Sequence, residues 1–239
     1  DTAISSGPRN GGSVKPGTVV FGWTGVDNAT PTERLKFQYQ MDGGGWSPDP
    51  AGSATTQTFS GLATSSHVFE VRAVDEAGHV DQSPARCEFS IDETAPTVGN
   101  PSVSDITYIS ALITWTTNEP TTGTVEYALA DGEYKFSYVD YSLTTSHLMS
   151  IGPLSSNTPY KARVRVSDEA GNESLSGEVT FTSGKLCDAA VLSQDLTFSS
   201  PVPAAGDPFT LSAKVKNLGD IPVSATAVFY DWSPQTGNV

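Results

Sequence analysis

Short segments in which hydrophobic and polar residues alternate recur along most of the chain. In its first part these segments are residues 19–24, 35–41, 55–59, 68–74 and 87–91. Further along they are residues 110–116, 124–129, 134–139, 146–151, 160–166 and 178–182. Alternation with a period of two is typical of strands that bury one face, and no stretch sustains the 3.6-residue period of a helix. The pattern predicts an all-β chain.

One strand-and-turn motif occurs twice. Residues 71–79, which read VRAVDEAGH, align with residues 164–172, which read VRVSDEAGN. In each copy an alternating strand runs into Asp-Glu-Ala-Gly, where glycine permits a left-handed turn position and aspartate can accept bonds from the following backbone. The motif predicts a hairpin between the last two strands of each repeat. The spacing of the copies is about that of one immunoglobulin-like sandwich, roughly 100 residues.

The repeat predicts tandem immunoglobulin-like β-sandwiches. We expect two complete domains, residues 1–95 and 96–184, followed by a partial third, residues 185–239. In the third, Phe209, Leu211, Ala213 and Val215 alternate as in a half-buried strand. A third copy of the turn would fall beyond Val239, so we expect this domain to be completed by further chain or by a strand that another molecule donates.

Three family resemblances accompany this pattern. The sequence FQYQMDGGGW at residues 37–46, with residues 66–73 and 91–96, resembles the bacterial immunoglobulin-like domains of large surface proteins. The sequence ALITW at residues 111–115, with the spacing of Leu154 and Tyr160, resembles a fibronectin type III domain. Residues 207–219 are similar to the adhesion-related CARDB domain of bacteria and archaea. These resemblances imply a secreted or cell-surface protein in which this chain acts as a spacer.

Charge narrows the classes of partner. The 27 acidic and 13 basic side chains give a net charge of −14, which opposes binding to nucleic acid and to anionic membranes. No apolar run approaches the roughly 18 residues of a spanning helix, so we expect no membrane insertion in this segment. The chain opens at Asp1 without an initiator methionine, so we expect it to be cut from a longer precursor.

The sequence contains no recognisable catalytic motif. His67, His79 and His147 are scattered and no pair has metal-ligand spacing; Gly-x-Ser-x-Gly, His-Glu-x-x-His, Walker and dinucleotide-binding patterns do not occur. The adjacent acids Asp75-Glu76 and Asp168-Glu169 belong to the predicted turns, where solvated carboxylates are poor general acids. We therefore expect no catalytic residues and no enzymatic activity.

Calcium is the one candidate cofactor. In an immunoglobulin-like topology the last hairpin of the second domain and the loop between its second and third strands lie beside the preceding linker. This places six oxygen-bearing residues near one junction: Asp92, Glu93, Asn118, Glu119, Asp168 and Glu169. Hard oxygen ligands are those that calcium requires. The alternative is that these residues only solvate the tips of turns.

An aromatic run and two cysteines complete the candidates. Tyr134, Phe136 and Tyr138 share the parity of one strand face, with Tyr141 close behind. If exposed, they could stack on sugars or anchor a protein; we favour burial in a core or at a domain junction, because every strand must bury one face. Cys87 shares parity with Phe89 and Ile91 and is expected to point into the first core. Cys87 and Cys187 are expected to be unpaired, since a whole sandwich separates them.

The functional expectation is a non-catalytic extracellular structural or adhesion module, such as a stalk, fibre or cell-surface spacer of a larger protein. Its expected partners are other domains of the same polypeptide, and neighbouring surface or filament proteins or polysaccharide. The alternatives are an accessory carbohydrate- or protein-binding region of an exported hydrolase and a subunit of an extracellular filament.

Overall fold

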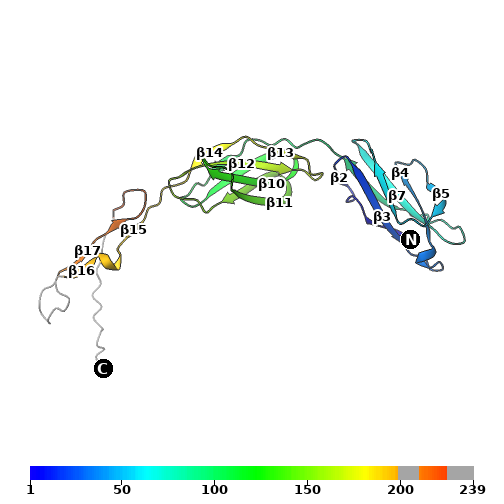
Figure 1. Cartoon of the computed structure of the whole chain (residues 1–239), viewed down its shortest axis with the longest axis horizontal. Coiled ribbons are helices and arrows are strands. Elements are labelled where there is room, and N and C mark those ends of the chain that lie inside the picture. The colour runs from blue at the N-terminus through cyan, green and yellow to red at the C-terminus, as the bar shows by residue number, and fades with distance from the viewer. Residues whose placement is uncertain (199–209, 225–239) are drawn as a thin grey trace, which may run out of the picture.

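The structure, a computed structural model, describes residues 1–198 and 210–224. The described chain is an elongated, gently curved row of β units (Figure 1). We call residues 1–95 the first unit, 96–184 the second unit and 185–239 the third segment. Within the described ranges no sheet pairs strands from two of these parts. The predicted β-sandwich class is confirmed, while the domain boundaries themselves stay predictions.

The first unit contains two sheets. Its strands are β1 (Thr2–Ser6), β2 (Gly12–Val14), β3 (Thr18–Gly25), β4 (Lys36–Met41), β5 (Ser47–Gly52), β6 (Thr56–Ser60), β7 (Ser66–Val74) and β8 (Ala85–Ile91). A short 3₁₀ turn, η1 (Thr32–Arg34), precedes β4. One sheet has the order β1-β3-β6 and the other β2-β8-β7-β4-β5. Every pair is antiparallel except β2 with β8.

The second unit is built around two long strands. Its strands are β9 (Ser102–Ser104), β10 (Ala111–Leu129), β11 (Phe136–Ile151), β12 (Pro159–Ser167), β13 (Glu173–Leu175) and β14 (Val179–Thr182). The strand order is β11-β10-β12-β13, with β9 also paired to β10 and β14 to β12. The first half of β10 pairs with the last part of β11, and its second half pairs with β12 and with the first part of β11. Each long strand therefore serves both layers of the sandwich.

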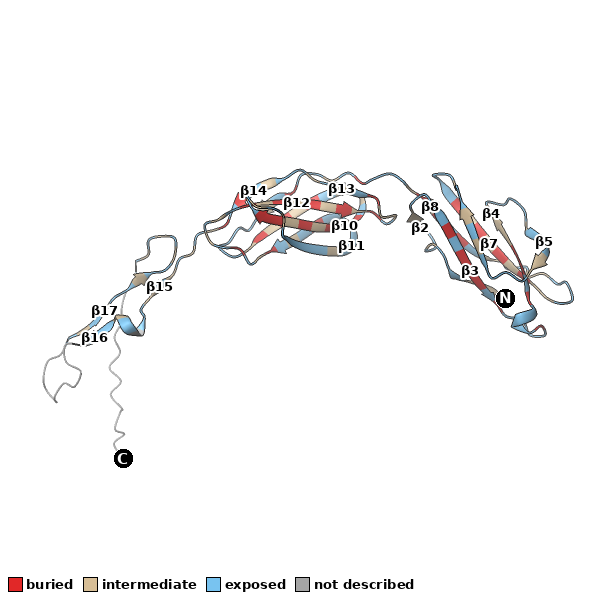
Figure 2. Cartoon of the chain, in the orientation of Figure 1, coloured by how far each residue is buried: buried red, intermediate tan, exposed pale blue. Residues whose placement is uncertain are grey.

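Alternation along the strands produces the cores. In β7, His67, Phe69, Val71 and Ala73 are buried while the residues between them are not. In β12, Tyr160, Ala162, Val164 and Val166 show the same pattern. Figure 2 shows this as buried bands along the central strands of both units. Each unit thus has its own hydrophobic cluster.

The third segment contains small β pairs in its described part. β15 (Ala189–Ala190) pairs with β18 (Lys216–Asn217), and β16 (Leu196–Phe198) pairs with β17 (Leu211–Ala213), with η2 (Ser193–Asp195) between β15 and β16. Leu211 and Ala213 lie in the predicted strand, but Val215 lies outside β17 and Phe209 lies outside the described residues. No helix in the described ranges has the length and hydrophobicity needed to span a bilayer.

Two details of the predicted strands are wrong. Residues 110–116 and 124–129 were expected as separate strands, as were 134–139 and 146–151, but each pair is one continuous strand, β10 and β11. The polar stretch between the halves stays extended and passes from one layer to the other, with register shifts between Thr116 and Gly123. The strands β1, β2, β5, β9 and β13 were missed. β2, β9 and β13 have only 3 residues each, and β5 contains Pro48 and Pro50, which obscure a strand pattern.

The repeated turn is confirmed as a hairpin turn in both units. Gly78 and Gly171 have φ of 87° and 92°. Asp75 and Asp168 each accept bonds from the backbone N–H four residues on, at 2.7 and 2.8 Å. Cys87 lies in the first core as expected, Cys187 is exposed, and both are free.

Candidate functional site

Three carboxylates meet at the junction of the two units. Asp92 comes from the linker after β8, Glu119 from the middle of β10, and Asp168 from the turn after β12. One ligand oxygen of each lies within 4.8 Å of the others. We call these residues the junction cluster. Among the described residues, none of the three carboxylates forms an ion pair with a basic side chain.

Asp168 is the buried member of the junction cluster, with 6% of its surface exposed. Its Oδ1 accepts bonds from the N–H groups of Gly171 and Asn172 at 2.7 and 2.8 Å. Its Oδ2 accepts a bond from Asn172 Nδ2 at 3.0 Å. A carboxylate offers about four lone-pair sites, so roughly one remains for a cation. The turn therefore fixes Asp168 in place and leaves Asp92 and Glu119 to supply most of the free oxygens.

Asn172 ties this turn to the linker. Its Nδ2 lies 3.1 Å from the carbonyl oxygen of Asp92 and 3.3 Å from that of Thr94. A second contact across the junction is the ion pair between Arg9 of the first unit and Glu169, with Nε to Oε1 at 2.9 Å. The Arg9 side chain is 73% exposed, and exposed pairs contribute only about 0–1 kcal/mol. The buried Asn172 amide is the stronger constraint on the linker.

The other predicted calcium ligands have different positions. Asn118 accepts a bond from the Thr97 N–H through Oδ1 at 2.6 Å and donates to Glu119 Oε1 at 3.3 Å. Glu169 is engaged by Arg9, and Glu93 is exposed. Arg9 and Asn172 were not among the predicted site residues. The repeat could have pointed to Asn172, because the two copies of the motif differ at this position, which is His79 in the first unit.

In the first unit the equivalent turn is closed by its own histidine. His79 Nδ1 lies 2.8 Å from Asp75 Oδ2, and His79 N donates to Asp75 Oδ1 at 2.7 Å. The bond from His79 is the largest influence on the pKa of Asp75 and holds it below its usual value. The His79 imidazole therefore bonds to the turn aspartate as the Asn172 amide does in the second unit. Only Asn172 also reaches the linker carbonyls.

Asp42, His67 and Ser65 form a line that resembles a catalytic triad. His67 Nδ1 lies 2.7 Å from Asp42 Oδ2, and Nε2 lies 3.4 Å from Ser65 Oγ. However, Nε2 also donates to the Ala63 carbonyl at 2.8 Å. Burial alone would lower the pKa of His67, but the Ala63 carbonyl and the Asp42 carboxylate outweigh it and raise that pKa. With both ring nitrogens donating, His67 has no lone pair with which to accept a proton from Ser65.

The aromatic run does not form one buried face. Tyr134 precedes β11 and lies over Arg163, with its ring centroid 4.0 Å from the guanidinium carbon. Its hydroxyl donates to Glu178 at 2.8 Å, and burial together with that carboxylate raises the pKa of Tyr134 to about 12. Phe136 and Tyr138 stack instead on Tyr127. The strand begins only at Phe136, so the parity argument did not apply to Tyr134.

The predicted burial of these aromatic residues is wrong for most of them. Phe136 is 55% exposed, Tyr138 37% and Tyr141 83%. They lie on β11, an edge strand that pairs with β10 on one side and, among the described residues, with no strand on the other. A groove of about 490 Å³ runs between Phe136 and Pro153. The role of these residues in binding sugar or protein stays a prediction.

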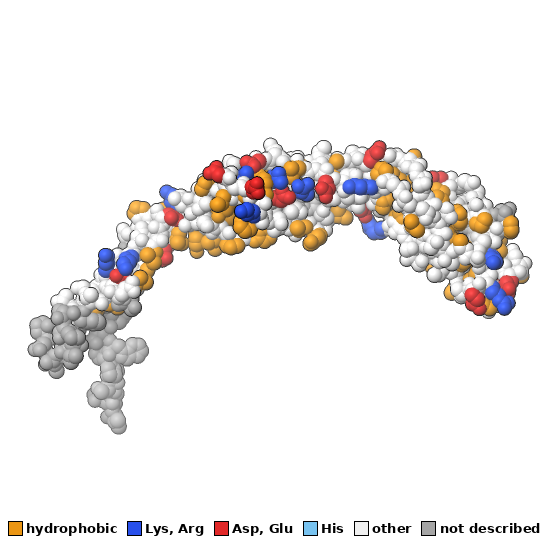
Figure 3. All heavy atoms as spheres, viewed as in Figure 1, with side chains coloured by type: hydrophobic (Ala, Val, Ile, Leu, Met, Phe, Trp, Pro, Cys, Tyr) orange, Lys and Arg blue, Asp and Glu red, His pale blue; other side chains and the backbone are white. Residues whose placement is uncertain are grey.

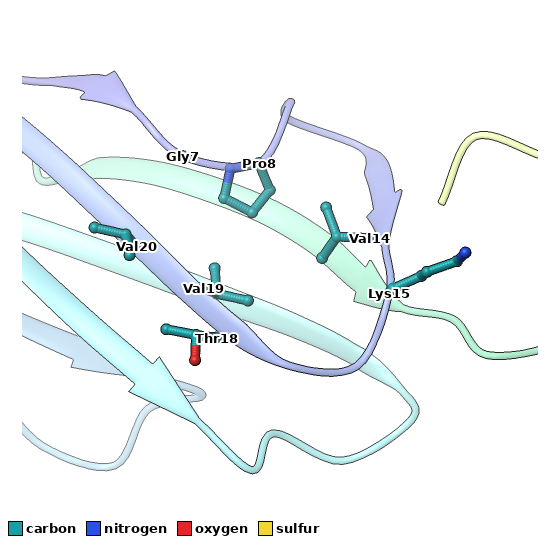
Figure 4. A pocket seen from close by; sticks show the side chains of 7 residues that line it. All are labelled: Gly7, Pro8, Val14, Lys15, Thr18, Val19 and Val20. Carbon is teal, nitrogen blue, oxygen red and sulfur yellow. The ribbon is translucent and has the colours of Figure 1, made fainter. Parts of the chain in front are cut away.

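A second hollow lies in the first unit. It has a volume of about 360 Å³ and opens between the segment after β1 and the start of β3 (Figure 4). Its lining side chains include Pro8, Val14, Val19 and Lys15, with no carboxylate, histidine or cysteine among them. Lys15 is the only titratable side chain of this hollow, so it holds no pair of groups for acid–base chemistry.

No model of a known protein family matches the chain, and no curated protein matches it. Among solved structures, the FN1–FN3 domains of chicken CNTN1 match with a TM-score of 0.54 and 13% identity, over 76% of this chain and 66% of that one. The chain thus spans slightly less than two thirds of that structure.

Two further structures match with lower TM-scores. The fibronectin(III)-like modules of Clostridium thermocellum CbhA match with a TM-score of 0.49 and 17% identity, over 77% of this chain and 94% of that one. Domains A168–A170 of titin match with a TM-score of 0.46 and 15% identity, over 72% and 61%. The similarity to the CNTN1 domains shows that the chain has the β-sandwich fold of fibronectin type III domains.

Proposed function

We propose that this chain is a non-catalytic structural and adhesion module of a larger secreted or cell-surface protein. In this role it holds other parts of that protein at a set distance and direction. The observation that carries the proposal is the set of contacts that closes the first junction. Asn172 donates to two carbonyls of the linker, and Pro96, the first residue of the second unit, is fully buried. A linker held in this way transmits orientation from one unit to the next, which a free tether does not.

The positions of the hydrophobic, histidine and acidic side chains support the same role. The hydrophobic side chains fill two separate cores, and His67 and His79 each bond to an aspartate of the same unit. Acidic charge is spread over the outside of the row (Figure 3). A net charge of −14 keeps such a rod solvated and apart from anionic surfaces. Bacterial or archaeal origin and the CARDB-like identity of the third segment belong to this proposal.

We expect Asn172→Ala to loosen the junction. Each lost bond to a linker carbonyl weakens it by about 0.5–1.5 kcal/mol. The measurement is the distance between spin labels at Val20→Cys and Leu175→Cys in a Cys187→Ser background, by pulsed electron paramagnetic resonance. Both labelled positions are exposed and lie on strands of different units. The parent should give one narrow distance distribution and Asn172→Ala a clearly broader one.

The repeat supplies the control for this experiment. His79→Ala changes the aligned residue of the first unit, whose side chain is 84% exposed and bonds to Asp75 of its own turn. It should leave the distribution narrow. A parent distribution as broad as that of Asn172→Ala would show a freely hinged linker and would overturn the spacer proposal.

The junction cluster favours one addition to this function, calcium binding that stiffens the joint. Calcium takes six to eight oxygen ligands, and carboxylates can bind it with both oxygens. Asp92, Glu119 and the remaining site on Asp168 provide hard oxygens from three segments that folding alone brings together. A cation there would also neutralise carboxylates that now repel one another. The alternative is that water alone solvates the carboxylates of the junction cluster.

We expect calcium to raise the melting temperature of the second unit and to bind measurably by isothermal titration calorimetry. At a free concentration of about 100 times the dissociation constant, the stabilisation is about 2.7 kcal/mol. Glu119→Gln should abolish both effects. Glu76→Gln, in the equivalent turn of the first unit, should leave them intact. An unchanged melting temperature and no binding heat at millimolar calcium would overturn the calcium proposal. The spacer proposal would be unaffected by that result.

A further inference from the structure

His67 is a buried histidine near the start of β7. It shares the inward face of that strand with Phe69 and Val71, which are fully buried, and only 6% of its own side chain is exposed. Its ring lies 5.5 Å from that of Phe89 on β8. A polar ring in such a place must find its hydrogen-bond partners within the protein, because little water reaches it.

Both ring nitrogens of His67 face acceptors. Nδ1 lies 2.7 Å from Oδ2 of Asp42, in the turn between β4 and β5. Nε2 lies 2.8 Å from the carbonyl oxygen of Ala63, in the loop at residues 61–65 between β6 and β7. A neutral imidazole has one N–H and one lone pair, so it satisfies only one of these acceptors, whereas the imidazolium satisfies both. The charged ring therefore ties the turn to the loop.

Ser65 offers the same ring a second partner. This serine is exposed on the loop, and its Oγ lies 3.4 Å from Nε2 of His67. A hydroxyl can donate or accept, and its hydrogen rotates to suit the partner. Once Nε2 has lost its proton, its lone pair repels the Ala63 carbonyl oxygen but can accept a bond from Ser65. The two protonation states of His67 thus favour different partners on one loop.

Asp42 is the charged group that faces the His67 ring. The loop presents a carbonyl and a hydroxyl to it, and β8 presents an aromatic ring. On β7 and β8 the charged side chains alternate with the buried ones and so belong to the outer face of the sheet; they are Glu70, Arg72, Arg86 and Glu88. Lys36 of β4 is opposite Val74, at the far end of β7, and Asp92 belongs to the junction cluster.

The acidity of both groups agrees with this contact. Burial disfavours the charged ring, but the Ala63 carbonyl and the Asp42 carboxylate outweigh it, so the pKa of His67 lies above its ordinary 6.5. Burial also acts to raise the pKa of Asp42, but the bonds from His67 and the Val68 N–H hold it below its ordinary value. The folded chain therefore binds the His67 proton more tightly than the unfolded chain. The resulting stability is fully present below about pH 6.5 and is lost as pH rises through the raised pKa of His67.

We propose that His67 is a pH-sensitive clasp of the first unit: the charged ring holds the loop at residues 61–65 to the β4–β5 turn, and the neutral ring releases Ala63 and accepts a bond from Ser65. The Nε2 proton passes to solvent. The clasp lies at the end of the unit where the linker begins, since the Ser65 carbonyl accepts a bond from the Ile91 N–H at 2.9 Å. All of its groups belong to the first unit, so it does not depend on the spacer role.

Nitrogen NMR of the His67 ring reads its protonation state and tautomer directly. In the full chain labelled with ¹³C and ¹⁵N, both ring nitrogens should carry hydrogen at pH 6, and the titration midpoint should lie above 6.5. Above the midpoint Nδ1 should keep its hydrogen, which Asp42 accepts, and the carbonyl carbon of Ala63 should shift with the same midpoint. His67→Gln identifies the His67 signals. A ring that is neutral at pH 6, or that keeps its hydrogen on Nε2, overturns the proposal.

Two serine variants form a matched pair. Ser65→Ala removes the donor to the neutral ring, so the His67 midpoint should rise by about 0.5 pH units. Ser66→Ala makes the same change at the next residue, whose Oγ lies 3.3 Å from that of Ser90, and should leave the midpoint unchanged. Equal midpoints in the two variants overturn the exchange of partners.

The same proton should appear in the stability of the first unit. In a urea titration the methyl signals of Val71 report on the first unit and those of Val164 on the second, since both side chains are fully buried. The urea midpoint of the first unit should be lower at pH 9 than at pH 6 in the parent, and this difference should be lost in His67→Gln. A parent midpoint that is as high at pH 9 as at pH 6 overturns the clasp, as does an equal fall in His67→Gln.

Discussion

Phe69→Ala should lower the free energy of unfolding of the first unit by about 3–5 kcal/mol, because it removes the centre of that core. Phe69 is fully buried on β7. Its ring stacks on Phe21 at 4.0 Å and 15°, and lies 5.8 Å from both Trp23 and Phe59. The truncation leaves a cavity that the rigid sheets cannot close. Since small domains are stable by only about 5–15 kcal/mol, this is a large fraction of the total.

The measurement is urea unfolding followed by hydrogen exchange, which reports on each unit separately. The first unit should unfold at a much lower urea concentration, while the second should keep its midpoint, because the two hydrophobic clusters share no residue. Val20→Ala is the matched control. It lies beside Phe21 on β3 but is 49% exposed, so its cost should stay within about 0.5 kcal/mol. A joint shift of both units after Phe69→Ala would show one cooperative core.

The features of the fold that are local in sequence were predictable. Alternation fixes which face of β7 and β12 is buried, because the side-chain period of a strand is two regardless of context. The Asp-Glu-Ala-Gly turn was equally predictable, since Gly78 and Gly171 have the positive φ that glycine adopts without strain. The approach of Asp92, Glu119 and Asp168 followed from topology, because the loops at one end of a sandwich meet.

Features that depend on strand ends and on packing between units could not be read in this way. Residues 117–123 were expected to form a loop between two strands, yet β10 continues through them because the two layers share the strand. Tyr134 was placed with Phe136 by parity, which has no meaning outside the strand. The Arg9–Glu169 contact joins residues 160 positions apart, and only the angle between the two units determines it.

Gly123→Ala should be among the most destabilising changes in the second unit. Its backbone does not have a positive φ, so alanine is not excluded by backbone strain. The constraint is Trp115, because a Cβ at position 123 would lie 2.3 Å from Cζ2 of that indole. The indole cannot easily move away, since it is 3% exposed and stacks on His147 at 4.7 Å and 2°. Overpacking of this kind costs about 1–3 kcal/mol and occasionally more, and we expect about 3.

A double-mutant cycle separates this steric cause from a general intolerance of substitution. Trp115→Phe removes the indole atoms nearest Gly123 and should itself destabilise the unit by leaving a cavity. In that background Gly123→Ala should be close to neutral, because the added methyl group occupies part of the freed space. Gly99→Ala, whose nearest built contact is 3.6 Å, should cost little in either background. Urea unfolding of the four variants gives the coupling energy; an equal cost of Gly123→Ala with Trp115 and with phenylalanine would assign the effect to the backbone instead.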